Sequence, residues 1–275
     1  MVAGWLRAAG HEPELLELTT TGDRWSEAGT DAAADKGLFV KELEEALLDG
    51  RAHLAVHSAK DLPGELPAGL AVLAVPERED PRDVLVGPPG GLGGLPADAA
   101  IATGSPRRAA QILAARPDLR VVPIRGNVGT RLEKLARGDA DALVLAAAGL
   151  RRLGLEPAGA LPLPVDVSTP APGQGLLALE GRAGDAAVAA AAAALDDPVA
   201  HACLRAERAL LAALGGGCLE PVGALCEPRA GGLRITAFAG TADGVRGRRV
   251  VREGSFAEPE ALGALAAAAL AGVRE

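Results

Sequence analysis

The stretch that decides the fold class is IATGSPRRAAQILAARPDLRVVPIRGNVGTRLEKLARGDADALVLA, residues 101–146. Short apolar runs in it alternate with longer segments whose apolar residues recur at helical spacing. They predict a strand, helix, strand, helix and strand, over residues 101–103, 107–115, 120–124, 130–137 and 142–146. This alternation indicates an α/β unit with a mostly parallel, doubly wound sheet.

The rest of the chain predicts a similar unit before this stretch and a different one after it. Strands are expected over residues 14–19, 54–57, 70–75 and 84–86, with a helix over 41–49, and residues 176–180 return as a strand to the first unit. From residue 198 the pattern becomes a long helix, meandering strands and a last helix, which is typical of a small α+β domain. The expected domains are residues 1–76 with 176–195, residues 81–170, and residues 198–275.

Positive charge is concentrated in residues 101–152, which include the stretch quoted above and the six residues after it. Residues 101–152 hold ten Lys and Arg against four Asp and Glu, a balance of +6, whereas the whole chain is −8, so the remainder sums to −14. Nucleic-acid binders are usually basic over a whole face or domain. A compact cationic segment fits a small ligand with several carboxylates or phosphates better, because guanidinium groups bind such anions in a forked geometry.

Two junctions in this segment are candidate anion sites. Ser105 and Pro106 are typical of a helix N-cap and first turn, which places Arg107 and Arg108 where cations oppose the helix dipole. The second junction, Arg125–Arg131, follows a strand and opens a helix, and its glycines allow close approach of a ligand while Thr130 can cap. The alternatives are a solvated surface pair of arginines and an ordinary turn.

Two other residues are candidates for chemistry. Asp61 follows Lys60 in a proline-bounded loop beyond a strand, where a carboxylate can hold a developing positive charge or relay a proton; a surface Lys–Asp pair is the common alternative. Cys218 follows three glycines and is accessible as a thiolate. Cys203, inside the long helix, and Cys226, at a strand end, are expected to be core residues.

Composition excludes several classes of protein. With three Phe, two Trp and no Tyr among 275 residues, stacking on nucleic-acid bases is not an expected binding mode. The three cysteines form no CxxC pair and the four histidines are scattered, so no metal site is predicted. The alanine-rich runs are too short to span a bilayer. We therefore expect a soluble cytoplasmic protein that binds neither nucleic acid nor membrane.

Five motifs in order carry a resemblance to a known family: KGLFVKEL from Lys36, HSAKDLP from His57, EREDPRD from Glu77, RGNVGTR from Arg125 and GGC ending at Cys218. The chain resembles hydroxymethylbilane synthase, also called porphobilinogen deaminase, over nearly its whole length. The resemblance implies two hinged units like those of periplasmic binding proteins, plus a small α+β C-terminal domain. It also implies a monomer that joins four porphobilinogen molecules head to tail, with loss of ammonia, and then releases hydroxymethylbilane by hydrolysis.

The resemblance assigns roles to residues. Cys218 would hold a dipyrromethane cofactor through a thioether, and Asp61 would stabilise cationic pyrrole intermediates and assist proton transfer. Arginines would pair with the carboxylates of cofactor and growing chain: Arg107, Arg108, Arg125, Arg131 and Arg152. Other matched positions line the cofactor or cleft: Lys36, Phe39, Lys60, Thr103, Ser105, Gly126 and Gln174.

One departure from the family concerns its N-terminal strand with an Arg-x-Ser segment, which nothing here matches. We expect the polypeptide as written to be destabilised in its first domain and weakly active, because a missing central strand leaves backbone groups unpaired. The alternatives are a weakly active or inactive truncated homologue, and a two-lobed non-catalytic protein that binds small polycarboxylates.

Overall fold

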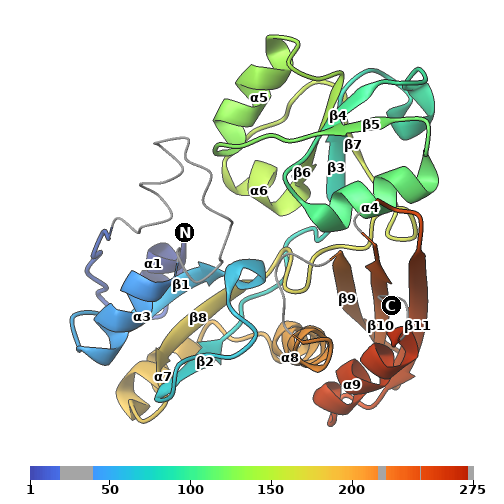
Figure 1. The fold of residues 1–275 in the computed structure, drawn as a ribbon. Coiled ribbons are helices and arrows are strands. Elements are labelled where there is room, and N and C mark those ends of the chain that lie inside the picture. Colours follow the sequence, from blue (N-terminus) through green and yellow to red (C-terminus); the bar gives the residue numbers. More distant parts are fainter. Residues whose placement is uncertain (19–39, 216–220, 242, 272–275) are drawn as a thin grey trace.

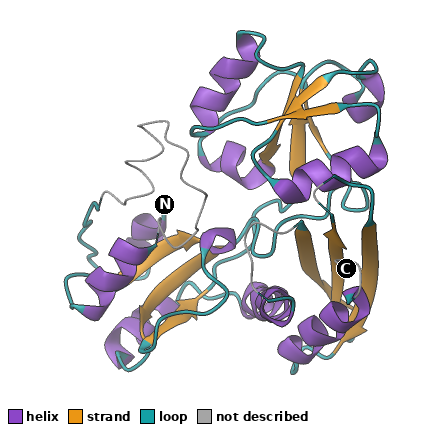
Figure 2. Ribbon diagram, in the orientation of Figure 1, coloured by secondary structure: helices purple, strands orange, loops and turns teal. Residues whose placement is uncertain are grey.

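Three separate β-sheets organise the chain in the computed structural model, which describes residues 1–18, 40–215, 221–241 and 243–271 (Figure 1). We call the parts built on these sheets the first, second and third units. Helices cover the sheets of all three units (Figure 2). The α/β fold class predicted from the sequence is confirmed.

The first unit has a three-stranded sheet of order β1 (Leu54–Ser58), β8 (Leu177–Arg182) and β2 (Leu70–Ala74). Strand β8 is antiparallel to both neighbours, as expected for a strand returning from elsewhere in the chain. Alternate β8 residues face opposite layers. Leu177 and Leu179 pack with α1 (Val2–Ala8) and α7 (Ala186–Ala193), while α3 (Lys41–Leu48) packs through Leu47 on Ala55 and Leu70.

The second unit has a five-stranded sheet of order β5 (Arg120–Val122), β4 (Ala100–Ala102), β6 (Ala142–Ala146), β3 (Asp83–Val86) and β7 (Ala160–Pro162). Strands β5, β4 and β6 are parallel, but β3 is antiparallel to β6 and β7, so the sheet is mixed rather than mostly parallel. Its alternating buried residues pack with α4 (Pro106–Ala115) on one face and with α5 (Val128–Ala136) and α6 (Ala147–Arg152) on the other.

The third unit pairs helices with an antiparallel meander. Helices α8 (Pro198–Ala213) and α9 (Pro259–Leu270) pack on β9 (Val222–Arg229), β10 (Gly232–Gly240) and β11 (Gly247–Gly254). Asp197 caps α8 by accepting hydrogen bonds from the amides of Val199 and Ala200, and Pro198 occupies its first turn.

The prediction of a strand over residues 14–19 is wrong for residues 14–18, which the structure describes. Residues 11–18 have no regular structure, and Leu15 and Leu16 are 75% and 52% exposed; Thr19 lies outside the described residues. Alternating apolar residues form a strand only where a sheet edge pairs with them. Among the described strands, β1 pairs with β8 alone.

Two crossings, residues 77–82 and 170–176, connect the first and second units. They are tied together by the Glu79 amide, which donates to the Gly175 carbonyl at 3.1 Å. From the third unit, the fully buried Glu207 pairs with Arg78 at 2.7 Å and accepts from the amides of Gly173 and Cys226. Burial raises the pKa of Glu207 in spite of Arg78. One carboxylate on α8 thus joins both crossings to the third unit.

Within the described ranges no single helix has the length and apolar character to cross a membrane, although α7 and α8, bent by 113° at their break, would together pass on length and composition.

Candidate active site at the junction of the units

The loop that carries Asp61 starts where β1 ends. Residues Ala59–Asp61 form a short 3-10 helix, fixed by the buried side chains of Ala59 and Leu62 and by the Ala59 amide, which donates to the Leu176 carbonyl. Lys60 and Asp61 are half-buried. The loop lies beyond the carboxyl end of a strand, where the sequence placed it and where ligands bind in open α/β sheets.

Gly173 brings the second crossing directly against this loop. A side-chain carbon at position 173 would lie 2.8 Å from the carbonyl carbon of Ala59 and 2.8 Å from the nitrogen of Lys60. Its φ of +77° also favours glycine. The backbone of the Asp61 loop in the first unit therefore packs closely against the backbone of the crossing to the second unit.

Beside this contact lies a buried ionic cluster, which we call the Asp83 cluster. Asp83 is fully buried and bonds both Arg107 and Arg108, with closest distances of 2.7 Å to each. Ser168 and Gln174 also donate to the Asp83 carboxylate. Burial alone would raise the pKa of Asp83, but the two arginines outweigh it and hold this pKa far below its usual range.

The cluster excludes the alternative of a solvated surface pair for Arg107 and Arg108. Arg107 and Arg108 are only 4% and 7% exposed, and each already has Asp83 as a partner. Their first-turn placement on α4 is confirmed, with Ser105 accepting from the Arg108 amide at 3.4 Å and Pro106 following it. Two guanidinium groups against one carboxylate leave a net charge of +1 for a ligand.

The other predicted site arginines differ in their surroundings. Arg131 donates to the Gly126 carbonyl and Arg152 to the Gly175 carbonyl, each at 2.7 Å, and burial lowers the pKa of both. The like charge of Arg108 adds to the effect on Arg131. Arg125 is exposed. Arg152 thus contacts the second crossing and Arg131 its own turn, close enough to Arg108 for their charges to interact, whereas Arg125 is exposed.

The capping of α5 differs from the prediction. The helix starts at Val128, and its cap is Asn127, whose side chain accepts from the Thr130 amide at 2.9 Å. Thr130 therefore receives the cap rather than providing it. Gly126 has φ +109°, and a side-chain carbon there would lie 2.8 Å from Thr130, so the turn requires glycine as expected.

Lys60 connects the Asp61 loop electrostatically to the Asp83 cluster. Burial lowers the pKa of Lys60 to about 8, Asp61 and Asp83 oppose that fall, and Arg108 and Arg107 add to it. The charges of Asp61, Asp83, Arg107 and Arg108 therefore all act on Lys60 at this junction. With Arg131 and Arg152, the local sum is five positive and two negative groups, or +3, which suits a ligand that carries several carboxylates.

The lowered pKa of Lys60 predicts a pH dependence of stability. The unfolded chain, with a Lys pKa of ~10.4, holds this proton more tightly than the folded chain. Between about pH 8 and pH 10.4 the unfolded state binds more protons, so the free energy of unfolding should rise with pH, by at most about 3 kcal/mol. Urea unfolding of wild type and Lys60→Met across this range measures it.

The control for this prediction is Lys41→Met, on the exposed side of α3, which should follow the wild-type pH trend. If Lys60→Met retains the rise between pH 8 and pH 10.4, the rise does not come from Lys60 and the prediction is wrong.

Of the other predicted site residues, some lie outside the described part of the chain and the rest lie at the junction. Lys36, Phe39 and Cys218 lie outside the described residues. Thr103 is buried and its hydroxyl accepts from the Ser105 amide, so both stand at the start of α4. Gln174 is buried and donates to the Pro81 carbonyl and to Asp83. The structure thus brings Thr103, Ser105 and Gln174 to the same junction as the two buried arginines.

Cys203 and Cys226 are buried, as predicted for core residues. A hydrogen bond with Cys203 and burial together raise the pKa of the Cys226 thiol. Since the thiolate is the nucleophilic form, Cys226 is poorly suited to bond a cofactor.

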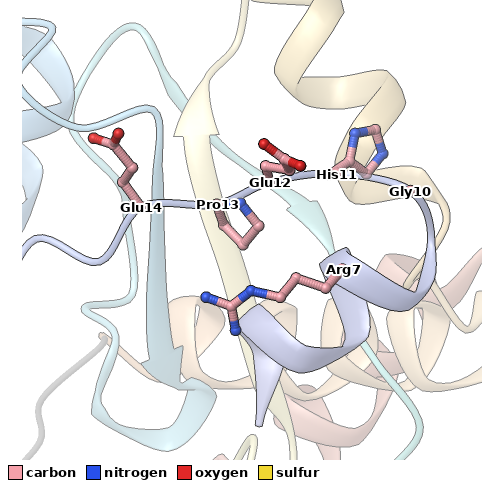
Figure 3. A pocket seen from close by; sticks show the side chains of 6 residues that line it. All are labelled: Arg7, Gly10, His11, Glu12, Pro13 and Glu14. Atoms are coloured by element: carbon pink, nitrogen blue, oxygen red, sulfur yellow. The ribbon is translucent and has the colours of Figure 1, made fainter.

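A cavity of about 530 Å³ lies away from this junction, next to α1 (Figure 3). Arg7 extends from the helix below the segment that follows it, and the lining is completed by Gly10, His11, Glu12, Pro13 and Glu14. It contains none of the predicted site residues, so the candidate site is the junction and not this cavity.

Sequence reasoning missed the central member of the cluster, Asp83, and its neighbours Ser168 and Thr169. Asp83 closes the EREDPRD motif, which carries the family resemblance but by itself indicates no role for any one of its residues. The available signal was an acidic residue directly before the apolar run Val84–Val86, because a carboxylate at the start of a buried strand needs a cationic partner. No local pattern indicates that the partner is 24 residues away.

Comparison with known proteins gives consistent matches. Residues 1–190 match the family model described as porphobilinogen deaminase, dipyromethane cofactor binding domain, and residues 201–272 match the porphobilinogen deaminase C-terminal domain. The chain is 50% identical over 266 residues to the porphobilinogen deaminase of Roseiflexus castenholzii, covering 96% of this chain and 88% of that one. It is 49% identical over 250 residues to that of Thiobacillus denitrificans, covering 90% and 82%.

Among solved structures, the substrate binding protein of an amino acid ABC transporter is similar at 16% identity and a TM-score of 0.36, over 70% of this chain and 77% of that one. A likeness at this level carries no argument about function.

Proposed function

This chain belongs to the porphobilinogen deaminase family, and from that premise we propose which of its residues perform the family's reaction. Members are transferases, the hydroxymethylbilane synthases, which act on porphobilinogen, and the matched domain is the one that binds the dipyrromethane cofactor. The observation that carries the proposal is the contact of the Lys60–Asp61 loop with the crossing that adjoins the Asp83 cluster.

The residues at the junction fit the cofactor. Dipyrromethane bears several carboxylates, and the junction has an excess of positive charge together with the hydroxyl groups of Thr103 and Ser105. When bound, the cofactor supplies the pyrrole position to which substrate is added. We assign the thioether to Cys218, and the carboxylate contacts to Arg107, Arg108, Arg125, Arg131 and Arg152, with Lys36, Phe39, Lys60, Gly126 and Gln174 also lining the site.

Asp61 is the proposed catalytic residue. Its half-buried carboxylate follows Lys60 and is held by the 3-10 helix whose ends are fixed by Ala59 and Leu62. There it can face the positive charge that develops on the substrate as ammonia leaves, and it can accept and return a proton. Asp61 and Asp83 are the two carboxylates that act on Lys60 at the junction. Asp83 is already paired with two arginines, so we assign this task to Asp61.

The three units support the proposed domain division into residues 1–76 with 176–195, residues 81–170, and residues 198–275. We also propose that the enzyme is a cytoplasmic monomer that binds neither nucleic acid nor membrane, in keeping with its net charge of −8 and its few aromatic residues.

Intact-mass analysis tests the function. The wild-type chain should be heavier than its sequence by one dipyrromethane, and incubation with porphobilinogen should add further increments of one substrate less ammonia. Cys218→Ser should lose the adduct entirely, whereas the control Cys203→Ser should keep it. A wild-type chain without adduct, or one that binds porphobilinogen without adding mass, would favour a non-catalytic binding protein or an inactive homologue.

A further inference from the structure

Arg249, on β11 of the third unit, contacts the second unit near the Asp83 cluster. Its Nε donates to the Thr169 hydroxyl at 2.9 Å and its Nη2 donates to the Gln111 side-chain oxygen at 2.8 Å. The guanidinium carbon lies 5.5 Å from the centre of the Phe238 ring, within the range of a cation–π contact.

Its two acceptors belong to a buried network that includes Arg107. The Gln111 oxygen also accepts from the Thr169 amide at 2.8 Å, and the Gln111 nitrogen donates to the Thr169 carbonyl at 3.1 Å. The same carbonyl accepts from Arg107, which bonds Asp83. Gln111 and Thr169 are 2% and 0% exposed. A loss at one member therefore leaves buried polar groups unsatisfied in the others.

The geometry of the contact specifies arginine. Nε and Nη2 form one edge of a planar group and bond two acceptors side by side, which the single ammonium of lysine cannot reproduce. Burial lowers the pKa of Arg249, although Asp166 opposes the fall. The desolvation indicated by this shift is consistent with a built contact rather than a loose surface one.

A second contact holds the same hairpin against the same helix. The turn between β10 and β11 packs on α4: a side-chain carbon at Gly244 would lie 2.7 Å from the Ala110 carbonyl oxygen and 2.8 Å from the Leu113 Cβ. Helix α4 accordingly lies across the end of the β9–β11 sheet (Figure 1). The hairpin and α4 therefore meet at two points, one of them the polar network that contains Arg107.

We propose that Arg249 is a positioning residue for the reaction: it holds Thr169 and Gln111, and through them it fixes Arg107 in the Asp83 cluster. Docking of the third unit then determines the orientation of a carboxylate-binding arginine in the second unit. The inference rests on the proposed role of Arg107 and adds a residue on which that role depends.

The test compares Arg249→Lys with Arg248→Lys, which makes the same change at the adjacent, exposed position of the same strand. Arg249→Lys should keep its dipyrromethane adduct, yet raise the KM for porphobilinogen about ten-fold or more, the size of a lost charged hydrogen bond. Arg248→Lys should match wild type. Combining Arg249→Lys with Gln111→Leu should give no larger effect than the stronger single change.

Hydrogen exchange provides a measurement independent of activity. In Arg249→Lys the Thr169 amide should exchange at least about ten-fold faster than in wild type, since its acceptor Gln111 is no longer held; Arg248→Lys should show no change. Equal KM values and equal exchange rates in the two lysine variants would overturn the inference. So would a double variant in which the KM increases of Arg249→Lys and Gln111→Leu multiply. A wild type that carries no adduct would instead count against the proposed function, and the exchange comparison would still decide the role of Arg249.

Discussion

Replacing Asp83 with Asn should lower the free energy of unfolding by about 3–5 kcal/mol, the cost of removing one partner from a buried ion pair. The side chain keeps its size, but Arg107 and Arg108 lose the only carboxylate that bonds them among the described residues. Urea unfolding followed by circular dichroism measures the change. The matched control is Asp139→Asn, which breaks an exposed ion pair with Arg137 and should have little effect.

The Asp83 cluster also predicts an acid dependence of stability. Because the folded pKa of Asp83 lies far below the unfolded value of ~3.9, the folded state binds fewer protons than the unfolded state in acid. The stabilisation is present above the unfolded pKa and declines as the pH falls below it. Asp83→Asn should lose this part of the acid dependence. If its stability matches wild type at pH 7, the cluster does not stabilise the fold and the prediction is wrong.

Replacing Asp61 with Asn should reduce turnover of porphobilinogen by about 10²- to 10⁴-fold, the range for loss of a general acid–base group. Asn has the same shape but cannot hold a positive charge or carry a proton. Since Asp61 has no assigned part in attachment at Cys218, the variant should keep its dipyrromethane adduct. Initial rates and intact mass together measure both effects.

The control is Glu65→Gln, an exposed position of the same loop, which should keep wild-type turnover. Near-normal rates in Asp61→Asn would remove Asp61 from the mechanism. A variant that lost both its adduct and its unfolding midpoint would indicate a structural role for Asp61 instead.

Local patterns were sufficient for most elements of the fold. Apolar spacing, caps and proline positions all act within a few residues. They were sufficient to predict strand β1, the loop that carries Asp61, helix α8 and the meander of the third unit. The error at residues 14–18 has the opposite cause, because pairing depends on a neighbouring strand and not on the segment itself. The strand over residues 84–86 was predicted, but its antiparallel direction in the sheet was not, for the same reason.

Several residues of the junction were predicted from the sequence, but its central carboxylate, Asp83, and its electrostatics were not. Position in a helix turn indicated that Arg107 and Arg108 meet an anion, and they do, but the anion in the structure is Asp83 of the same chain. That pairing joins β3 to α4 and depends on the sheet order, which spacing does not encode. The link from Arg249 through Thr169 to Arg107 needs the third unit docked on the second, so no local pattern could indicate it.

The contact of Gly173 with the Ala59–Lys60 peptide has a mechanical consequence. A side chain at position 173 does not fit against the loop that carries Asp61, so the close packing of the second crossing on this loop depends on glycine. The Ala59 amide also donates to the Leu176 carbonyl at the end of this crossing. We therefore expect a displacement of the crossing to change the position of the Asp61 loop, which would couple the space between the units to the reach of the proposed catalytic carboxylate.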